Sequence, residues 1–143
     1  GEGYRHSVVS WASQGNFSEV SMEALLGFIF APLAAAIGAD FSDVLQLGQL
    51  LGTKMVANEF VAYLQLGEIQ ATGTLSPKSV FLATFALCGF ANFSSIGIQI
   101  GGIGALAPER RSDLAALGFK AMIGGTIASL LTASVAGIFF VMN

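Results

Sequence analysis

Residues 89–95 read Gly-Phe-Ala-Asn-Phe-Ser-Ser and stand inside an uncharged stretch of 30 residues, from Ser79 to Pro108. A continuous helix of that length would be about 45 Å long, whereas the hydrocarbon core of a bilayer is about 30 Å thick. The uncharged stretch is therefore too long to cross the bilayer as one straight helix. Its middle contains an asparagine, a glycine and two serines. Membrane transporters use helices with polar interruptions to hold a substrate at bilayer depth, so the sequence predicts a broken transmembrane helix here.

The composition indicates a membrane protein rather than a soluble all-helical one. Of the 143 residues, 54% are hydrophobic and 10% are charged, with a mean hydropathy of +0.73, whereas soluble domains have about 25% charged residues. The lack of a basic run argues against nucleic acid as a partner, and the net charge of −3 is too small to indicate any partner. One histidine and one cysteine provide no zinc ligand set, so we expect no cofactor; the cysteine, Cys88, is expected to be a small buried hydrophobe.

Two short apolar pieces precede the predicted broken helix, and neither could cross a bilayer alone. Residues 44–53 and 60–67 are uncharged, and Lys54 and Glu59 lie between them. Two half-length helices joined by a polar tip predict a re-entrant hairpin over residues 41–68. The alternative, an ordinary hairpin in a soluble protein, would need a polar face that these pieces lack.

The other segments complete an all-α membrane protein. Residues 24–39 are too short for a span and contain Pro32, which is expected to kink or end a helix, so they favour a helix in the membrane interface. Residues 69–78 are rich in turn formers and are expected to be a loop, in which Ser76 and Pro77 start the next helix. We therefore expect a polar lead-in over 1–20 and a transport domain over 21–143, made of an interfacial helix (22–37), the hairpin (41–68), the broken span (76–108) and a last span (112–142).

The last span carries a row of small residues at every fourth position: Ala121, Gly125, Ser129, Ala133 and Gly137. Such a row lets a second helix approach closely, which is how membrane helices associate. Chance in a helix rich in alanine and glycine is the alternative. We expect this face of the helix to be a packing surface.

The positions of the basic residues predict the orientation of the chain. Arg110 and Arg111 lie at one end of the broken span, and Lys78 lies at the other. Because cytoplasmic loops carry the excess of lysine and arginine, the turn over residues 109–113 is predicted to be cytoplasmic and the C-terminus to be outside. The chain is thus expected to be an integral protein of the cell (inner) membrane, surrounded by lipid.

Glu59, with its neighbour Asn58, is the first candidate for a functional residue. A carboxylate at the tip of a hairpin at membrane depth is energetically costly, so it is taken as functional by default. It could accept hydrogen bonds from the paired hydroxyls of a sugar, or take up a proton because desolvation raises the pKa of a carboxyl group. The alternative is a structural salt bridge to Lys54.

Polar and aromatic side chains at the break form a second candidate site: Phe90, Asn92, Ser94 and Ser95. A broken helix frees backbone groups that can face a cavity. Asparagine offers a donor and an acceptor, serine offers a hydroxyl, and phenylalanine offers a flat face for stacking. The alternative is a polar kink satisfied by neighbouring helices. Because His6 is the one histidine, no hydrolase triad is evident, and we expect that the protein is not an enzyme.

Two blocks of sequence are specific enough to indicate a family. Residues 58–63 read Asn-Glu-Phe-Val-Ala-Tyr, and the second block is the stretch at residues 89–95. On these blocks, and on residues 27–33 and 101–111, the chain resembles the concentrative nucleoside transporter family. The resemblance covers nearly everything from about residue 20 to the end.

The resemblance implies a homotrimeric transporter that moves nucleosides inward together with sodium ions or protons. The family has two inverted repeats, and this chain resembles the second; the first repeat, with the base-reading residues and most of the coupling-ion site, is expected outside this chain. The ribose contacts of the family correspond to Glu59, Asn92 and Ser95, with Asn58 beside them, and Phe90 corresponds to the aromatic residue beside the nucleoside. The alternative function is a structural or assembly module of membrane helices without a substrate site of its own.

Overall fold

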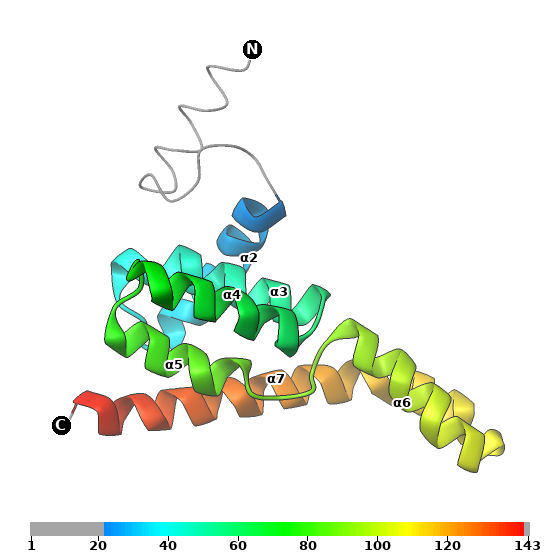
Figure 1. Ribbon diagram of the computed structural model, residues 1–143. Coiled ribbons are helices and arrows are strands. Elements are labelled where there is room, and N and C mark those ends of the chain that lie inside the picture. Colours follow the sequence, from blue (N-terminus) through cyan, green and yellow to red (C-terminus); the bar gives the residue numbers. More distant parts are fainter. Residues whose placement is uncertain (1–21, 142–143) are drawn as a thin grey trace.

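The computed structural model describes residues 22–141, and all regular structure in this part of the chain is helical (Figure 1). The prediction of an all-α fold is therefore confirmed. The lead-in predicted for residues 1–20 lies outside the described residues. The α-helices are α2 (Met22–Ala36), α3 (Val44–Val56), α4 (Glu59–Thr72), α5 (Pro77–Leu87), α6 (Phe93–Leu106) and α7 (Arg111–Val141), and two short 3-10 turns are η1 (Phe41–Asp43) and η2 (Pro108–Arg110).

Helix α2 packs against α3 at two glycines of α3. A Cβ atom built on Gly48 would lie 2.6 Å from the carbonyl oxygen of Gly27, and one built on Gly52 would lie 2.6 Å from the Cβ atom of Leu26. The two backbones can approach this closely only because both positions lack a side chain. Helix α2 continues through Pro32 to Ala36, close to the end predicted at residue 37. Pro32 is exposed, so the lost backbone hydrogen bond does not disturb the contact with α3.

We predict that Gly48→Ala destabilises the protein by about 1–3 kcal/mol, the usual range for overpacking. The added methyl group would meet backbone atoms of Gly27 and Ala31, at 2.6 and 2.8 Å, which cannot rotate away as a side chain could. Gly67→Ala on α4 is the matched control, because a Cβ atom there has nothing within 4 Å. Thermal unfolding in detergent measures both variants, and equal stability of the two would contradict the close contact between α2 and α3.

Helices α3 and α4 form a hairpin whose tip is at residues 57 and 58. Helix α4 continues to Thr72, so the predicted end of the hairpin at residue 68 is wrong, and so is the prediction of a loop for residues 69–72. The charge of Glu68 does not end the helix because this side chain is exposed. Gly73 ends α4 instead, with a left-handed φ of 68° that glycine adopts without strain.

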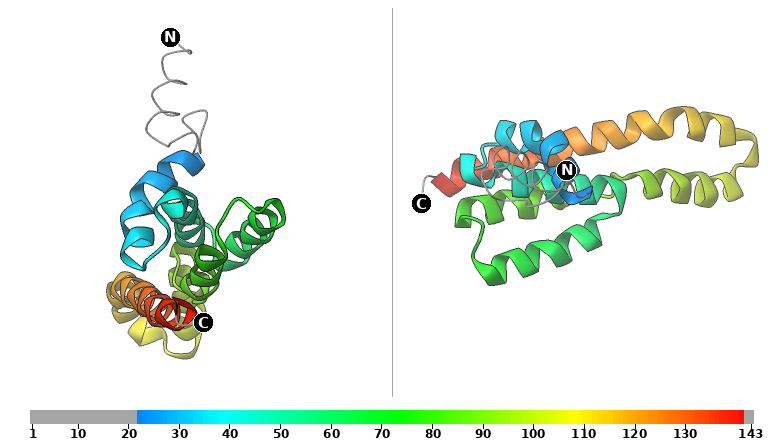
Figure 2. Two further views of the ribbon diagram at one scale, coloured as in Figure 1. Left: turned by 90° about the vertical axis from the view of Figure 1, so that its left-hand side faces the viewer. Right: turned by 90° about the horizontal axis from the view of Figure 1, so that it is seen from above.

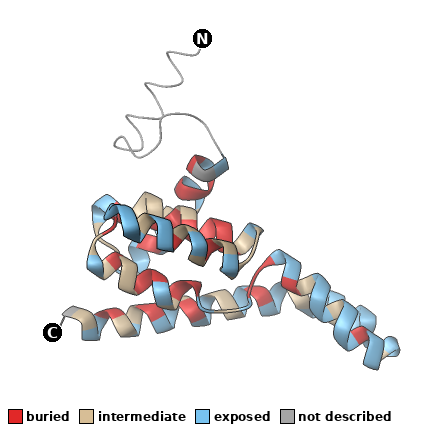
Figure 3. Cartoon of the chain, viewed as in Figure 1, coloured by how far each residue is buried: buried red, intermediate tan, exposed pale blue. Residues whose placement is uncertain are grey.

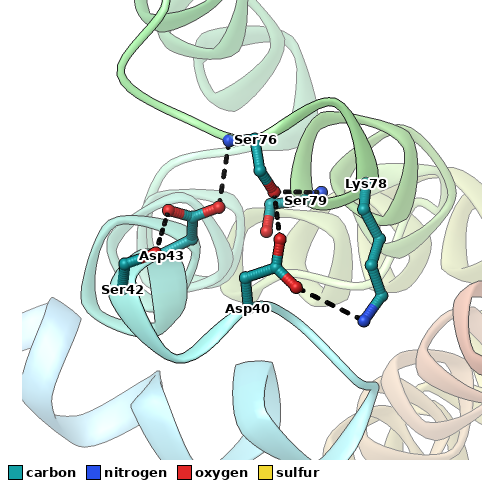
Figure 4. A network of polar contacts seen from close by, with 6 residues as sticks. All are labelled: Asp40, Ser42, Asp43, Ser76, Lys78 and Ser79. Carbon is teal, nitrogen blue, oxygen red and sulfur yellow. Dashed lines mark hydrogen bonds and ion pairs between the residues drawn. The ribbon is translucent and has the colours of Figure 1, made fainter.

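The base of the hairpin is tied to the start of α5 by two aspartates (Figure 4). Asp43 accepts a hydrogen bond from the backbone N–H of Ser76 at 3.0 Å, and Asp40 accepts one from the Ser76 hydroxyl at 2.6 Å. Lys78 lies 3.5 Å from Asp40. Ser76 also accepts from the N–H of Ser79, which confirms it as the N-cap of α5.

Asp43 is 5% exposed, and its environment favours the charged form of its side chain. Burial raises the pKa of the Asp43 carboxyl, but hydrogen bonds from the neighbouring serines together outweigh burial and hold this pKa below its usual value. The carboxylate therefore stays charged at neutral pH and fixes the spacing between the hairpin and α5.

The predicted broken span is present as two separate helices. Helix α5 ends at Leu87 and α6 begins at Phe93, with residues 88–92 in non-helical conformation between them (Figure 1). After η2, α7 begins at Arg111, so the charged turn predicted over residues 109–113 is shorter than expected. The Arg111 side chain donates to the carbonyl oxygen of Gly104 at 3.1 Å, near the end of α6. Within residues 22–141, one helical stretch, Pro108–Phe140, has the length and apolar composition needed to cross a membrane.

From Gly125 to Gly137 the row of small residues on α7 faces α5 and the break, as predicted for a packing surface, whereas Ala121 at its start is exposed. A Cβ atom on Gly137 would lie 2.7 Å from a methyl carbon of Leu82, and one on Gly125 would lie 3.1 Å from the Cβ atom of Ala91. Ala133 is fully buried, and Ser129 donates to the carbonyl oxygen of Cys88 at 3.1 Å. The partner of this face is therefore the broken helix of the same chain.

The apolar core and the most exposed helices lie at opposite ends of the molecule. Helix α6 and the first half of α7 run side by side and extend away from the other helices as an arm (Figure 2). Buried positions concentrate where α3, α4 and α5 meet the second half of α7, while most of the arm is exposed (Figure 3). The break between α5 and α6 lies where the arm joins the core. The core consists of Ala34, Ile37, Leu47, Leu50, Leu51, Ala62, Leu66, Leu75, Leu82, Ala83, Ala86, Leu87 and Ala133.

Candidate functional site

The tip of the hairpin and the break in the helix meet at a contact between Asn92 and Glu59. The side-chain amide of Asn92 donates a hydrogen bond to Oε2 of Glu59, with 2.9 Å between the two atoms. The two residues are 33 positions apart in the sequence. Asn92 is fully buried, whereas Glu59 is partly exposed. The structure thus brings together the leading residues of the two candidate sites.

Asn92 is held in place because it also caps α6. Its Oδ1 atom accepts from the backbone N–H of Ser95 at 2.8 Å and from the hydroxyl of Ser94 at 2.7 Å. The Ser95 hydroxyl in turn accepts from the backbone N–H of Asn92 at 3.2 Å, which completes a capping box. Since Oδ1 is occupied by α6, the amide NH₂ group is the part of Asn92 that can face Glu59.

Two helices begin at this contact, and each begins with an asparagine cap. Asn58 accepts from the backbone N–H of Val61 at 3.0 Å and so caps α4, while Asn92 caps α6. Glu59 is the first residue of α4. An acidic residue in the first turn of a helix interacts favourably with the partial positive charge of the helix N-terminus. Asn58 therefore contributes to the site by fixing the start of α4, next to Glu59.

On the other side of the break, side chains of the hairpin donate hydrogen bonds to carbonyl groups in the last turn of α5. The last four carbonyl groups of a helix have no partner within the helix. Here Tyr63 donates to the carbonyl oxygen of Thr84 at 2.6 Å, and Lys54 donates to that of Ala86 at 2.9 Å. The backbone N–H of Cys88 donates to the carbonyl oxygen of Phe85 at 3.2 Å. The hairpin therefore contacts both ends of the break, with Glu59 on one side and with Lys54 and Tyr63 on the other.

Two expectations from the sequence are corrected at the break. The alternative salt bridge between Lys54 and Glu59 is not among the ion pairs of the described residues, and Lys54 instead contacts Ala86 and Ser129. Cys88 is exposed rather than buried, because α5 has already ended when the chain reaches it. The role of Lys54 carries no local signal in the sequence, since its two partners are 32 and 75 residues away.

Phe90 and Ser95 border a cavity of about 370 Å³ between α6 and α7. Phe90 is 52% exposed, whereas Ser95 is 5% exposed and uses its hydroxyl in the capping box. The other residues that line the cavity are mainly apolar, and Glu59 and Asn92 are not among them. The predicted site residues thus divide into a polar contact (Glu59, Asn92 and the cap Asn58) and an adjoining apolar cavity.

These features define the class of protein to which the chain belongs. A helix broken at polar residues, a carboxylate and an amide that meet at the break, and a helix long enough to cross a membrane are the features of a membrane transporter. Residues 5–137 match the family described as "Na+ dependent nucleoside transporter C-terminus". The chain belongs to this family of concentrative nucleoside transporters, as its sequence blocks predict, and the family is one of transporters rather than enzymes.

Similar proteins come from bacteria and animals. An uncharacterized transporter of Bacillus subtilis, YutK, is 51% identical over 120 residues, which cover 84% of this chain and 29% of that protein. Solute carrier family 28 member 3 of Homo sapiens is 36% identical over 149 residues, which cover 94% of this chain and 22% of that protein. A solved structure of CNTnw in an inward-facing substrate-bound state is similar with a TM-score of 0.81 at 36% identity, over 98% of this chain and 34% of that one. The chain spans about a third or less of each of these proteins.

Proposed function

We propose that this chain provides the ribose-binding half of the nucleoside site in a transporter that takes up nucleosides together with sodium ions or protons. The hydrogen bond between Asn92 and Glu59 carries the proposal, since it joins a donor and an acceptor at the point where a membrane helix is broken. Its support from similarity is membership in a nucleoside transporter family and likeness to a substrate-bound structure. The coupling ion binds mainly to parts of the transporter outside this chain.

The geometry of Glu59 suits the adjacent hydroxyl groups of a ribose. Oε2 accepts from Asn92, and among the described residues Oε1 has no hydrogen-bond partner. A free carboxylate oxygen accepts strong hydrogen bonds from hydroxyl donors. Phe90 is exposed beside the break and offers an aromatic face to the same ligand. Ser95 acts through the capping box that fixes Asn92, and Asn58 acts by fixing the start of α4.

The setting of the site is a lipid bilayer. Large apolar side chains are exposed along α2 and α7, including Ile29, Leu131 and Ile138, and exposed apolar faces of this size need lipid or other protein segments to cover them. In this proposal α2 lies in the interface, the hairpin of α3 and α4 is re-entrant and α7 spans the bilayer. The turn over residues 109–113 is cytoplasmic, the C-terminus is outside, and a first repeat and two further copies complete a homotrimer.

The structural or assembly module remains the second candidate function. Its main support in the sequence is the row of small residues on α7, which would serve to bind another helix. In the structure this row packs against α5 and the break of the same chain, at Leu82 and Ala91. The row of small residues therefore packs against the broken helix within the same chain, and its presence does not require a partner helix from another protein.

The test is Asn92→Asp in the full-length transporter that contains this chain. Aspartate keeps the oxygen that caps α6 but removes the amide donor and places a second carboxylate against Glu59. We expect nucleoside affinity to fall by about 10- to 100-fold, since a hydrogen bond to a charged group contributes about 1.5–3 kcal/mol. Isothermal titration with uridine and adenosine measures the affinity, and uptake into proteoliposomes with a sodium or a proton gradient measures transport.

Gln70→Glu, an equally small change at an exposed position of α4, is the control. It should leave both affinity and uptake at the wild-type level. Wild-type affinity in a well-folded Asn92→Asp variant would remove the proposed site. Failure of the wild-type protein to bind any nucleoside would favour the structural module.

A further inference from the structure

Lys54 is the one lysine among the described residues that is buried, and the proposed function does not use it. It is 2% exposed, although lysine is rarely buried without a partner of opposite charge. Its ammonium group donates to the carbonyl oxygen of Ala86 at 2.9 Å and to the hydroxyl oxygen of Ser129 at 3.4 Å. Both hydrogen-bond partners are neutral groups on other helices, and the charge of Lys54 also interacts with that of Glu59 at a distance beyond an ion pair.

The two partners of Lys54 are the end of α5 and the face of α7 that packs against the break. Ala86 lies in the last turn of α5, where a helix has unpaired carbonyl groups and a partial negative charge. The Ser129 hydroxyl lies 3.1 Å from the carbonyl oxygen of Cys88 and 3.0 Å from that of Gly125, so its single proton is shared between the two acceptors. The ammonium group and the serine hydroxyl therefore hold the backbone on both sides of Leu87, where the helix stops.

The chain leaves almost no free space around this contact. A Cβ atom built on Gly89 would lie 2.6 Å from the hydroxyl oxygen of Ser129 and 3.6 Å from the ammonium nitrogen of Lys54. Three elements meet here: the hairpin through Lys54, the break through Gly89, and α7 through Ser129. Lys54 and Glu59 are five positions apart on the hairpin, and Ala86 and Asn92 are six positions apart across the break. Only a few residues of chain therefore separate Lys54 and its partner Ala86 from the two residues of the polar contact.

We propose that Lys54 is a positioning residue for nucleoside recognition: its ammonium group fixes the end of α5 against the hairpin and thereby sets where Asn92 meets Glu59. This inference rests on the proposed function, because it assigns a second group to the same site. The hydrogen bond from Lys54 to Ala86 would then fix the position of the hairpin relative to the break. Asn92 and Ser94 hold the hairpin at the start of α6, and Lys54 holds it at the end of α5.

The experiment compares Lys54→Met, Lys54→Arg and Ser129→Ala in the full-length transporter, with Lys120→Met, at an exposed position of α7, as the control. Small displacements of binding groups reduce recognition by up to about 100-fold. We expect Lys54→Met to raise the KM for nucleoside uptake about 10-fold or more with a smaller effect on the maximal rate, Lys54→Arg to recover part of the affinity, and Lys120→Met to change neither. An unchanged KM in a folded Lys54→Met variant overturns the proposal.

A double variant separates positioning from general destabilisation. If Lys54 acts through Asn92, then Lys54→Met and Asn92→Asp affect the same contact, and their effects on KM do not multiply. Effects that multiply fully would overturn the proposal. If Lys54→Met does not fold, Ser129→Ala replaces it in this comparison, since that variant removes one partner and leaves the charge with Ala86; an unchanged KM in Ser129→Ala then overturns the proposal.

Alkylation of Cys88 gives a readout that does not depend on transport. Cys88 is exposed and lies between the carbonyl group that Lys54 holds and Gly89, and its reaction rate with a maleimide reports the conformation of the break. We expect the rate to change several-fold in Lys54→Met and to stay constant in Lys120→Met. A wild-type protein that binds no nucleoside would refute the proposed function alone, whereas an alkylation rate unaffected by Lys54→Met would refute the role of Lys54.

Discussion

Glu59→Gln in the full-length transporter is expected to reduce nucleoside uptake by about 100-fold, because hydrogen bonds to a charged acceptor contribute about 1.5–3 kcal/mol. Glutamine has nearly the shape of glutamate, so α4 and its cap at Asn58 should persist. The substitution removes the negative charge and replaces one acceptor oxygen by a donor NH₂ group. Either Asn92 or the ribose hydroxyls then meet a donor instead of an acceptor. Initial rates of radiolabelled uridine and adenosine uptake measure the effect.

Glu68→Gln is the matched control for this prediction. It makes the same chemical change on the same helix, at an exposed position on the part of α4 remote from the tip. Its uptake should equal that of the wild type. If the Glu59→Gln variant is inserted normally and transports at the wild-type rate, the carboxylate does not bind the substrate, and the proposed site is wrong.

Gly89→Ala is expected to have the largest effect on the fold itself. Gly89 has a φ of +156°, a conformation that residues with a side chain rarely adopt, and strain of this kind costs about 1–3 kcal/mol. The new methyl group would also lie 2.6 Å from the hydroxyl oxygen of Ser129. Strain and steric overlap therefore act together at the break. We expect a lower unfolding temperature in detergent and a loss of nucleoside uptake.

Gly97→Ala should have the opposite effect on stability and leave the unfolding temperature unchanged or raise it. Gly97 lies within α6, and a Cβ atom there would have nothing within 4 Å. Alanine in a helix is more stable than glycine by about 0.5–1 kcal/mol, so this variant should unfold at an equal or higher temperature. Equal stabilities for Gly89→Ala and Gly97→Ala would mean that the break tolerates a side chain and that its backbone is not constrained.

The break was predictable from the sequence because its signals are local. An uncharged stretch too long for one span, with Gly89 and the Asn92–Ser95 pair at its middle, contains both the stop of one helix and the start of the next. The exact end of α5 at Leu87 and the capping box of α6 were not predicted and come from the structure. The small residues of α7 were also a sound signal, since a spacing of four places them on one face of a helix.

Other features were missed for physical reasons that differ from case to case. The extension of α4 to Thr72 was missed because Glu68 was taken as the end of an apolar helix, although an exposed charge does not stop a helix and Gly73 does. The contacts of Lys54 join residues far apart in the chain, so they could be found only after the helices had been placed.

Asn92 serves the fold and the polar contact with opposite ends of one small side chain. Its oxygen holds the first turn of α6, and its nitrogen is committed to Glu59. A substitution that removes both ends of this side chain, such as Asn92→Leu, would therefore disturb the start of α6 together with the contact to Glu59, whereas Asn92→Asp retains the capping oxygen. Phe90 does not cap a helix, and its side chain is half exposed. In the proposed site, Phe90 is therefore the position at which a substitution can alter a ligand contact without removing a helix cap.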